Sequence, residues 1–200
     1  MLAPRLRARL ATPDDDDACA AIYAPYVTGT SITFELTPPD AAGMRGRITR
    51  TMERTPWVVV EFDGVVRGYA YGARHRDRPA YDWTVETAVY VDPEHTGRGL
   101  GRAAMATLLD VLRLQGAHLA VAGITPPNPG SVRLHETLGF ERVGLFEAIG
   151  WKQGRWHGVE WFALELAPRG GDPMPMILLP RLVGSPALTD VLGRYAGRRR

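Results

Sequence analysis

A glycine-rich turn between a β-branched segment and an apolar segment is the part of this sequence best suited to bind a ligand. Gly97, Gly99 and Gly101 stand at alternate positions in this turn. Glycine has no Cβ, so backbone N–H groups here can approach a ligand closely. A helix beginning at this point would direct its free N–H groups and the positive end of its dipole to the same place. The turn therefore predicts a phosphate or pyrophosphate site, with Arg98 and Arg102 as flanking countercharges.

The common nucleotide-binding motifs do not match this turn. Arg102 occupies the position that a third glycine takes in G-x-G-x-x-G after Gly97 and Gly99, and no G-K-[ST] follows at P-loop spacing. Taken alone, the glycines are better explained by a turn that only starts a helix. The elements around the turn have to decide between the two explanations.

Hydrophobic periodicity and turn residues predict the elements that would position this turn. Strands are expected over residues 6–10, 57–62, 65–74, 83–91, 119–124, 141–148 and 159–166. Helices are expected over residues 13–26, 39–54 and 102–115, with a short one from Pro129 that Asn128 caps and Gly139 closes. Asp63-Gly64 predicts a tight hairpin turn. This order predicts an α/β (mixed α+β) fold, with a mixed sheet and helices on its faces.

The chain is expected to divide into a domain over residues 1–167 and a tail over residues 168–200. The segment Gly170–Pro173 is typical of a linker, and Ser185-Pro186 predicts the start of a terminal helix. Two alternatives stay open for this tail: it docks on the domain or on a partner subunit, or it is mostly disordered.

Composition limits the classes of function. The 200 residues are 45% hydrophobic and 23% charged with a net charge of +2, and the basic residues are scattered, which does not favour nucleic-acid binding. No stretch approaches the length of a membrane-spanning helix, and the N-terminus lacks the apolar core of a signal peptide. The single cysteine, Cys19, excludes an internal disulfide and is expected to be buried. A cytoplasmic protein without a membrane partner is expected.

No metal site is expected. His75, His95 and His118 lack metal-ligand spacing and are interpreted as solvated, and His157 as part of a hairpin motif. The acidic run 14–17 lies where a helix starts, so it favours the helix dipole rather than a metal ion.

Several motifs agree in order and spacing with one known superfamily. The element order, the loop 96–101 and the segment 128–136 resemble the GCN5-related N-acetyltransferase (GNAT) superfamily. The segments 80–86 and 150–157 are similar to its phosphinothricin N-acetyltransferase group. The resemblance covers about residues 5–166, and it implies a mostly antiparallel mixed sheet flanked by helices.

The resemblance implies that acetyl-CoA is the co-substrate. A strand edge would pair with its pantetheine arm, the glycine loop would bind its pyrophosphate, and the head of the next helix would contact it. The residues carried over to this role are Val89, Tyr90, Val91, Thr96, Gly97, Arg98, Gly99, Leu100, Gly101 and Asn128. Thr96 departs from the Gln or Arg that usually begins the loop, so backbone contacts are expected to survive and a side-chain contact is not.

Two residues are expected to carry the chemistry. Strand alternation places the Glu86 side chain on the opposite face of the sheet from those of Val85 and Thr87. The resemblance implies that Glu86 is the general base and acts through water. His135 stands where many members of the superfamily have tyrosine, and it would donate to the departing thiolate or assist deprotonation. The alternatives are a half-exposed Glu86 paired with an arginine, and a His135 that only packs beside Leu134 and Leu138.

The acceptor is expected to be small. The residues that resemble the lining of the acceptor pocket are Phe34, Arg74, Tyr81 and Trp83. Arg76 and Arg78 are further candidates to bind a carboxylate or phosphinate.

The expected function is transfer of acetyl to the primary amine of a small amino acid or analogue, of the phosphinothricin or methionine sulfone and sulfoximine class. Direct attack in a ternary complex is favoured because Cys19 has no activating neighbour and no G-x-S-x-G motif is present. The alternatives are acetylation of a protein N-terminus or lysine, and a non-catalytic acyl-CoA-binding module. A homodimer is expected.

Overall fold

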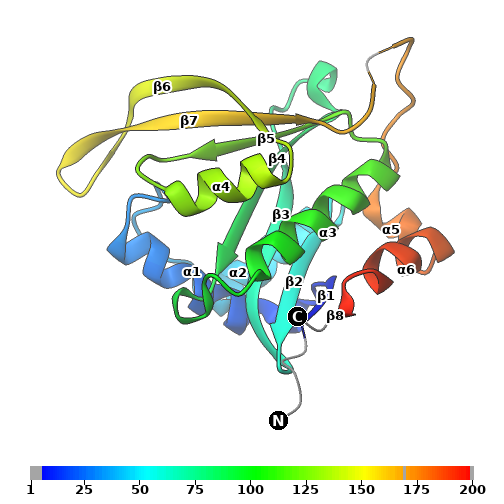
Figure 1. Cartoon of the computed structure of the whole chain (residues 1–200), viewed down its shortest axis with the longest axis horizontal. Coiled ribbons are helices and arrows are strands. Elements are labelled where there is room, and N and C mark those ends of the chain that lie inside the picture. The colour runs from blue at the N-terminus through cyan, green and yellow to red at the C-terminus, as the bar shows by residue number, and fades with distance from the viewer. Residues whose placement is uncertain (1–5, 169, 199–200) are drawn as a thin grey trace.

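The computed structural model describes residues 6–168 and 170–198, which form one twisted sheet with helices on both faces (Figure 1). Residues 1–5, 169, 199 and 200 of the expected domain and tail lie outside the described residues. The strands are β1 (Leu6–Leu10), β2 (Trp57–Phe62), β3 (Val65–Arg74), β4 (Thr84–Val91), β5 (Leu119–Ile124), β6 (Glu141–Lys152), β7 (Arg155–Glu165) and β8 (Ala196–Arg198). The helices are α1 (Asp16–Gly29), α2 (Ala41–Met52), α3 (Leu100–Gln115), α4 (Pro129–Thr137), α5 (Leu179–Leu182) and α6 (Pro186–Gly193).

The strands of the described chain form a single sheet in the order β6-β7-β5-β4-β3-β2-β1-β8. Strands β4 and β5 run parallel, and every other described pair is antiparallel. The mixed, mostly antiparallel sheet is therefore confirmed. The backbone at Asp63 and Gly64 has φ of 52° and 83°, as a two-residue hairpin turn requires, and it joins β2 to β3 as predicted.

Several predicted boundaries are wrong, and the largest differences are at the end of α1 and in the last hairpin. Helix α1 continues past Pro25 to Gly29 instead of ending near residue 26. The last hairpin is longer than predicted, because β6 continues through a bulge at Ala148, where φ is 47°, and a tight turn at Gln153-Gly154 returns the chain into β7. A bulge absorbs an extra residue without ending the strand pair.

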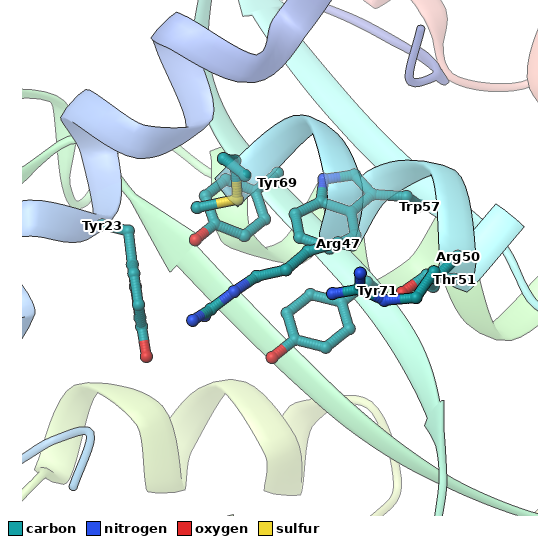
Figure 2. A pocket seen from close by; sticks show the side chains of 8 residues that line it. Tyr23, Arg47, Arg50, Thr51, Trp57, Tyr69 and Tyr71 are labelled. Carbon is teal, nitrogen blue, oxygen red and sulfur yellow. The ribbon is translucent and has the colours of Figure 1, made fainter. Parts of the chain in front are cut away.

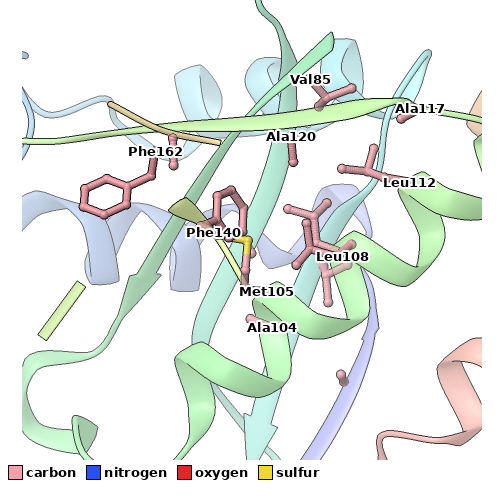
Figure 3. Packing of buried hydrophobic residues seen from close by; sticks show 14 of the residues in the cluster. Val85, Ala104, Met105, Leu108, Leu112, Ala117, Ala120, Phe140 and Phe162 are labelled. Carbon is pink, nitrogen blue, oxygen red and sulfur yellow. The ribbon is translucent and has the colours of Figure 1, made fainter. Parts of the chain in front are cut away.

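Separate apolar clusters hold the helices to the two faces of the sheet. Met105, Leu108 and Leu112 on one side of α3 pack on the sheet with Ala120 and Phe162 (Figure 3). On the opposite face, the cluster beneath α1 and α2 contains Ile22, Met44, Ile48, Trp57 and Tyr69. Among the described residues, no helix has both the length and the apolarity needed to cross a bilayer.

The C-terminal tail packs on the rest of the chain. Leu179, Leu182, Leu188 and Val191 of α5 and α6 are buried in a cluster with Val111 of α3. Figure 1 shows helices α5 and α6 beside α3. The side-chain amide of Gln115 in α3 donates to the carbonyl oxygens of Ile177 and Arg54, at 2.7 and 2.6 Å. Strand β8 then pairs with β1. Of the two alternatives for the tail, docking on the domain is the one the structure has.

Leu179→Ala should lower the free energy of unfolding by about 3 kcal/mol, because it leaves a cavity where a 1% exposed side chain stood. Urea denaturation followed by circular dichroism measures this loss. Val183→Ala, at a neighbouring side chain that is 59% exposed, is the control and should change stability by less than about 0.5 kcal/mol. Equal effects of the two substitutions would contradict the docked tail.

Candidate active site

The parallel strands β4 and β5 pair over only three residues and then separate. Thr84, Val85 and Glu86 pair with Leu119, Ala120 and Val121, and the register stops there. Strand β4 stays paired with β3 as far as Val91, so its other edge from residue 87 onward has lost its strand partner. Unpaired backbone N–H and C=O groups at such an edge need another partner. The backbone groups of β4 at this gap are therefore free to pair with an extended ligand.

A groove of about 850 Å³ occupies this gap. Its walls are residues 87–91 of β4, residues 122–125 at the end of β5, the loop before α3, and α4. Tyr26 and Ile32 close another side, and the Tyr26 hydroxyl donates to the carbonyl oxygen of Val91. The groove has the size of a small-molecule site.

The glycine loop lies at one end of this groove and leads into α3, as predicted. Gly97 and Gly99 have φ of 72° and 82°, in the left-handed region where glycine is favoured. Gly101 lets the helix approach the sheet, because a Cβ there would contact Leu134 and Val91 at 3.3 and 3.4 Å. The lining residues from this region are Thr96, Gly97, Gly99, Leu100, Gly101 and Arg102. The guanidinium of Arg98 turns away and lies 5.4 Å from the centre of the Phe62 ring.

Asn128 and His135 line the groove from α4. Asn128 caps the helix by accepting from the N–H of Ser131, at 3.1 Å. His135 is 3% exposed; its Nδ1 donates to the carbonyl oxygen of Ser131 at 2.8 Å, and its buried Nε2 has no partner among the described residues. Burial lowers the pKa of His135, against the opposing effect of the Ser131 hydrogen bond. The neutral ring therefore offers an Nε2 lone pair.

Glu86 stands at the last paired position of β4, where the strands separate. Its side chain is 38% exposed, and its Oε2 lies 3.3 Å from Nδ1 of His75. His75 was expected to be solvated, which is wrong: its side chain is 18% exposed and contacts the rings of Tyr81 and Trp161. The partner of Glu86 is thus His75, on the loop after β3, rather than an arginine.

Two predicted acceptor residues are engaged elsewhere. Arg74 donates to the carboxylate of Asp82, which also binds Arg54. The indole N–H of Trp83 donates to the carbonyl oxygen of Met174 in the tail, at 2.7 Å. Neither side chain points into the groove, so they brace the start of β4 in this structure.

Of the other two predicted acceptor residues, Tyr81 contacts His75 and Phe34 lies against the β6–β7 hairpin. A Cβ at Gly150 would overlap the ring of Phe34, so the two segments are in direct contact. The ring of His157 is 6.2 Å from that of Phe34. This contact holds the segment after α1 against the β6–β7 hairpin.

A second pocket, of about 230 Å³, lies beneath α2 on the face of the sheet that Glu86 shares (Figure 2). Tyr23, Arg47 and Tyr71 line it, and Figure 2 shows Arg47 extending between the two tyrosine rings. Arg47 makes two hydrogen bonds to the carboxylate of Glu35, at 2.6 and 2.8 Å. Burial raises the pKa of Tyr71 to about 12, so its hydroxyl stays protonated.

His95 was also expected to be solvated, and it lines the groove instead, with a side chain 18% exposed. With Asp92 and Glu94 it brings three ligand-type atoms within 4.8 Å of one another. Existing contacts account for this cluster: Asp92 pairs with Arg67 at 2.8 Å and accepts from the N–H of Glu94 at 3.0 Å.

The model of the acetyltransferase (GNAT) family matches residues 21–140, which include β4, the glycine loop, α3 and α4. The chain belongs to this family. The resemblance in its sequence motifs is thereby confirmed.

Named acetyltransferases of this family are similar in sequence to most of this chain. A phosphinothricin N-acetyltransferase of Streptomyces viridochromogenes is 39% identical over 84% of this chain and 94% of its own. An L-methionine sulfoximine/L-methionine sulfone acetyltransferase of Pseudomonas aeruginosa is 36% identical over 76% of this chain and 90% of its own. A crystal structure of a phosphinothricin acetyltransferase from Sinorhizobium meliloti in complex with acetyl-CoA superposes with a TM-score of 0.81, at 34% identity over 84% of this chain and 93% of that one.

Because the folded chain opposes protonation of His135, its lowered pKa predicts a pH-dependent loss of stability. The contribution is fully present above the ordinary imidazole pKa of about 6.5 and is lost as pH falls below that value. Urea unfolding of the wild type and His135→Gln at pH 7.5 and pH 5.5 measures it. The wild type should lose more stability over this interval than the variant. Equal losses would contradict a buried neutral His135.

Proposed function

We propose that this chain transfers the acetyl group of acetyl-CoA to the primary amine of a small amino acid or analogue, by direct attack in a ternary complex. The observation that carries this proposal is the unpaired edge of β4 beside the glycine loop. The strand edge can bind the extended pantetheine arm, and the adjacent loop can bind the diphosphate. The relatives named for phosphinothricin and for methionine sulfone and sulfoximine suggest the class of acceptor.

The groove fits the co-substrate in shape and donor set. Backbone groups of Val89, Tyr90 and Val91 would pair with the amides of the pantetheine arm. The N–H groups of residues 97–101 and the start of α3 would bind the pyrophosphate, with Arg102 as the nearby cation. The thioester would then lie near the point where β4 leaves β5.

Glu86 acts as the general base in this proposal. An amine is protonated near neutral pH and cannot attack until it loses a proton, which Glu86 receives through a water molecule. The half-exposed side chain leaves room for that water. The amine attacks the thioester carbon to form the C–N bond, and N–H groups of the free β4 edge stabilise the tetrahedral oxyanion. Collapse of this adduct breaks the C–S bond and releases the coenzyme thiolate, which takes a proton from solvent. His75 orients the carboxylate.

His135 assists deprotonation rather than donating to the thiolate. Its Nδ1 proton is committed to the Ser131 carbonyl, so in the neutral ring Nε2 is an acceptor. This Nε2 takes a proton that the reaction releases, through the groove that it lines. Of the two roles predicted from the sequence, the geometry favours this one.

A small acceptor fits better than a protein chain. We place Phe34 and Gly150, which are in direct contact, at one side of the acceptor site, whereas a polypeptide would need an open channel. The pocket beneath α2 gives room for an acceptor side chain on the face that Glu86 shares. Arg76 and Arg78, which form no ion pair within the described part of the chain, supply the positive charge for a carboxylate or phosphinate.

Thiol release from acetyl-CoA should be detected with phosphinothricin, methionine sulfone or methionine sulfoximine, and not with N-terminal peptides or lysine peptides. Glu86→Gln should lower kcat by about 100-fold or more, since a general base contributes that much, while the Kd for acetyl-CoA stays within about threefold. Glu136→Gln, at an exposed carboxylate of α4, is the control and should keep the wild-type rate.

Activity with peptides alone would replace the small acceptor by a protein. Unchanged turnover in Glu86→Gln would remove Glu86 from the mechanism. Binding of acetyl-CoA without release of thiol for any acceptor would favour a non-catalytic module.

The expected homodimer and the cytoplasmic location belong to this proposal as well. The outer side of the β6–β7 hairpin exposes Phe146, Ile149, Trp151 and Trp156, an apolar group of the kind that subunit contacts cover. A second copy of the chain is its proposed partner. The buried free thiol of Cys19, whose pKa burial raises to about 12, suits a reducing compartment.

Light scattering should give twice the mass of one chain at micromolar concentration. Trp156→Arg should raise the dissociation constant by about 30-fold or more, as loss of a central aromatic contact does. Val65→Arg, at an exposed valine beside the β2–β3 turn, is the matched control. A monomeric wild type, or dissociation by both substitutions, would contradict this interface.

A further inference from the structure

Residues 27–35 run from the last turn of α1 into the connection to α2, and residues 30–35 belong to no helix or strand. Ile32 lines the groove, and Phe34 packs on the hairpin two residues later. Tyr26, in the last turn of α1, lines the groove as well. The course of residues 27–35 therefore sets the position of Ile32 in the groove and of Phe34 against the hairpin.

Lys152, at the end of β6, is the group that holds both ends of this segment. Its Nζ donates to the carbonyl oxygen of Val27 at 2.6 Å and to that of Thr33 at 2.8 Å. Val27 belongs to the last turn of α1, where carbonyl groups lack partners within the helix and carry the negative end of its dipole. One ammonium thus ties residues 27 and 33 to the hairpin.

The lysine is buried, which makes this arrangement costly unless its donors are used. Only 5% of Lys152 is exposed, and burial lowers its pKa while the charge of Glu35 opposes that effect. An ammonium removed from water needs hydrogen bonds or a countercharge to be stable. The carbonyl of Lys152 is itself 3.0 Å from Nε2 of His157, which fixes the backbone at this end of the hairpin.

We propose that Lys152 is a positioning residue that fixes the segment 27–35, and with it the Ile32 and Phe34 walls of the site, against the β6–β7 hairpin. It touches neither the groove nor the carboxylate of Glu86, so it acts through the segment. The glycine loop lies outside this contact. Loss of Lys152 should therefore weaken acceptor use more than acetyl-CoA binding.

Lys152→Met tests this inference, with Arg155→Met as the matched control, because Arg155 pairs with Lys152 across the turn and is exposed. We expect Lys152→Met to raise KM for the acceptor by about tenfold, as loss of hydrogen bonds to a charged group does, with Kd for acetyl-CoA changed by less than about threefold. Hydrogen exchange should accelerate at residues 27–35 and stay unchanged at residues 97–103. Arg155→Met should leave each of these quantities at its wild-type value.

Only the kinetic part of this inference, the change in KM for the acceptor, rests on the proposed function. The hydrogen-exchange measurement needs no activity, so it separates failure of this inference from failure of the proposed function. Gly150→Ala provides a second route if Lys152→Met does not fold. It retains the lysine but displaces Phe34, and it should give the same rise in KM for the acceptor. Unchanged hydrogen exchange at residues 27–35 in Lys152→Met would overturn the inference. Equal changes in KM for the acceptor and in Kd for acetyl-CoA, in either variant, would also overturn it.

Discussion

The separation of β4 from β5 after Glu86 is the constraint on which the site depends. A parallel pair normally continues its ladder, and ending it leaves peptide groups without partners on both strands. Other elements keep the gap open: β4 stays in register with β3 to Val91, and β5 pairs with β7 as far as Ile124. The same event thus creates the groove and places the Glu86 side chain at its edge. The point where β4 leaves β5 thus sets where a ligand could pair with the β4 backbone.

Charged groups near the site are largely neutralised within the chain. Arg47 pairs with Glu35, Arg74 with Asp82 and Arg67 with Asp92. These pairs fix loops and leave the groove itself lined mostly by backbone, apolar and small polar groups. The two residues that we propose for the chemistry are the half-exposed carboxylate of Glu86 and the buried, neutral imidazole of His135.

Local patterns in the sequence were sufficient for most elements and for the turn into α3, but they predicted neither α5 nor β8. Strands β2, β3 and β5 have their predicted bounds, because apolar runs and an Asp-Gly turn are short-range signals. The contact of His75 with Glu86 was missed, since it depends on how β3 and β4 pair and on the course of the loop between them. Lys152 gave no signal either: a cation in a hairpin normally implies a solvated side chain, and the carbonyl of Val27 that it binds is 125 residues away.

The pairing of β8 with β1 has a further consequence for the chain as a whole. Without β8, the backbone of Leu6–Leu10 would form an open margin of the sheet on its side away from β2. Open margins of this kind recruit strands from neighbouring molecules and lead to aggregation. Strand β8 covers Leu6 and Arg7 of β1 and is itself only three residues long, so the C-terminal extension also leaves this side of the sheet with a shorter edge, which is a weaker template for association.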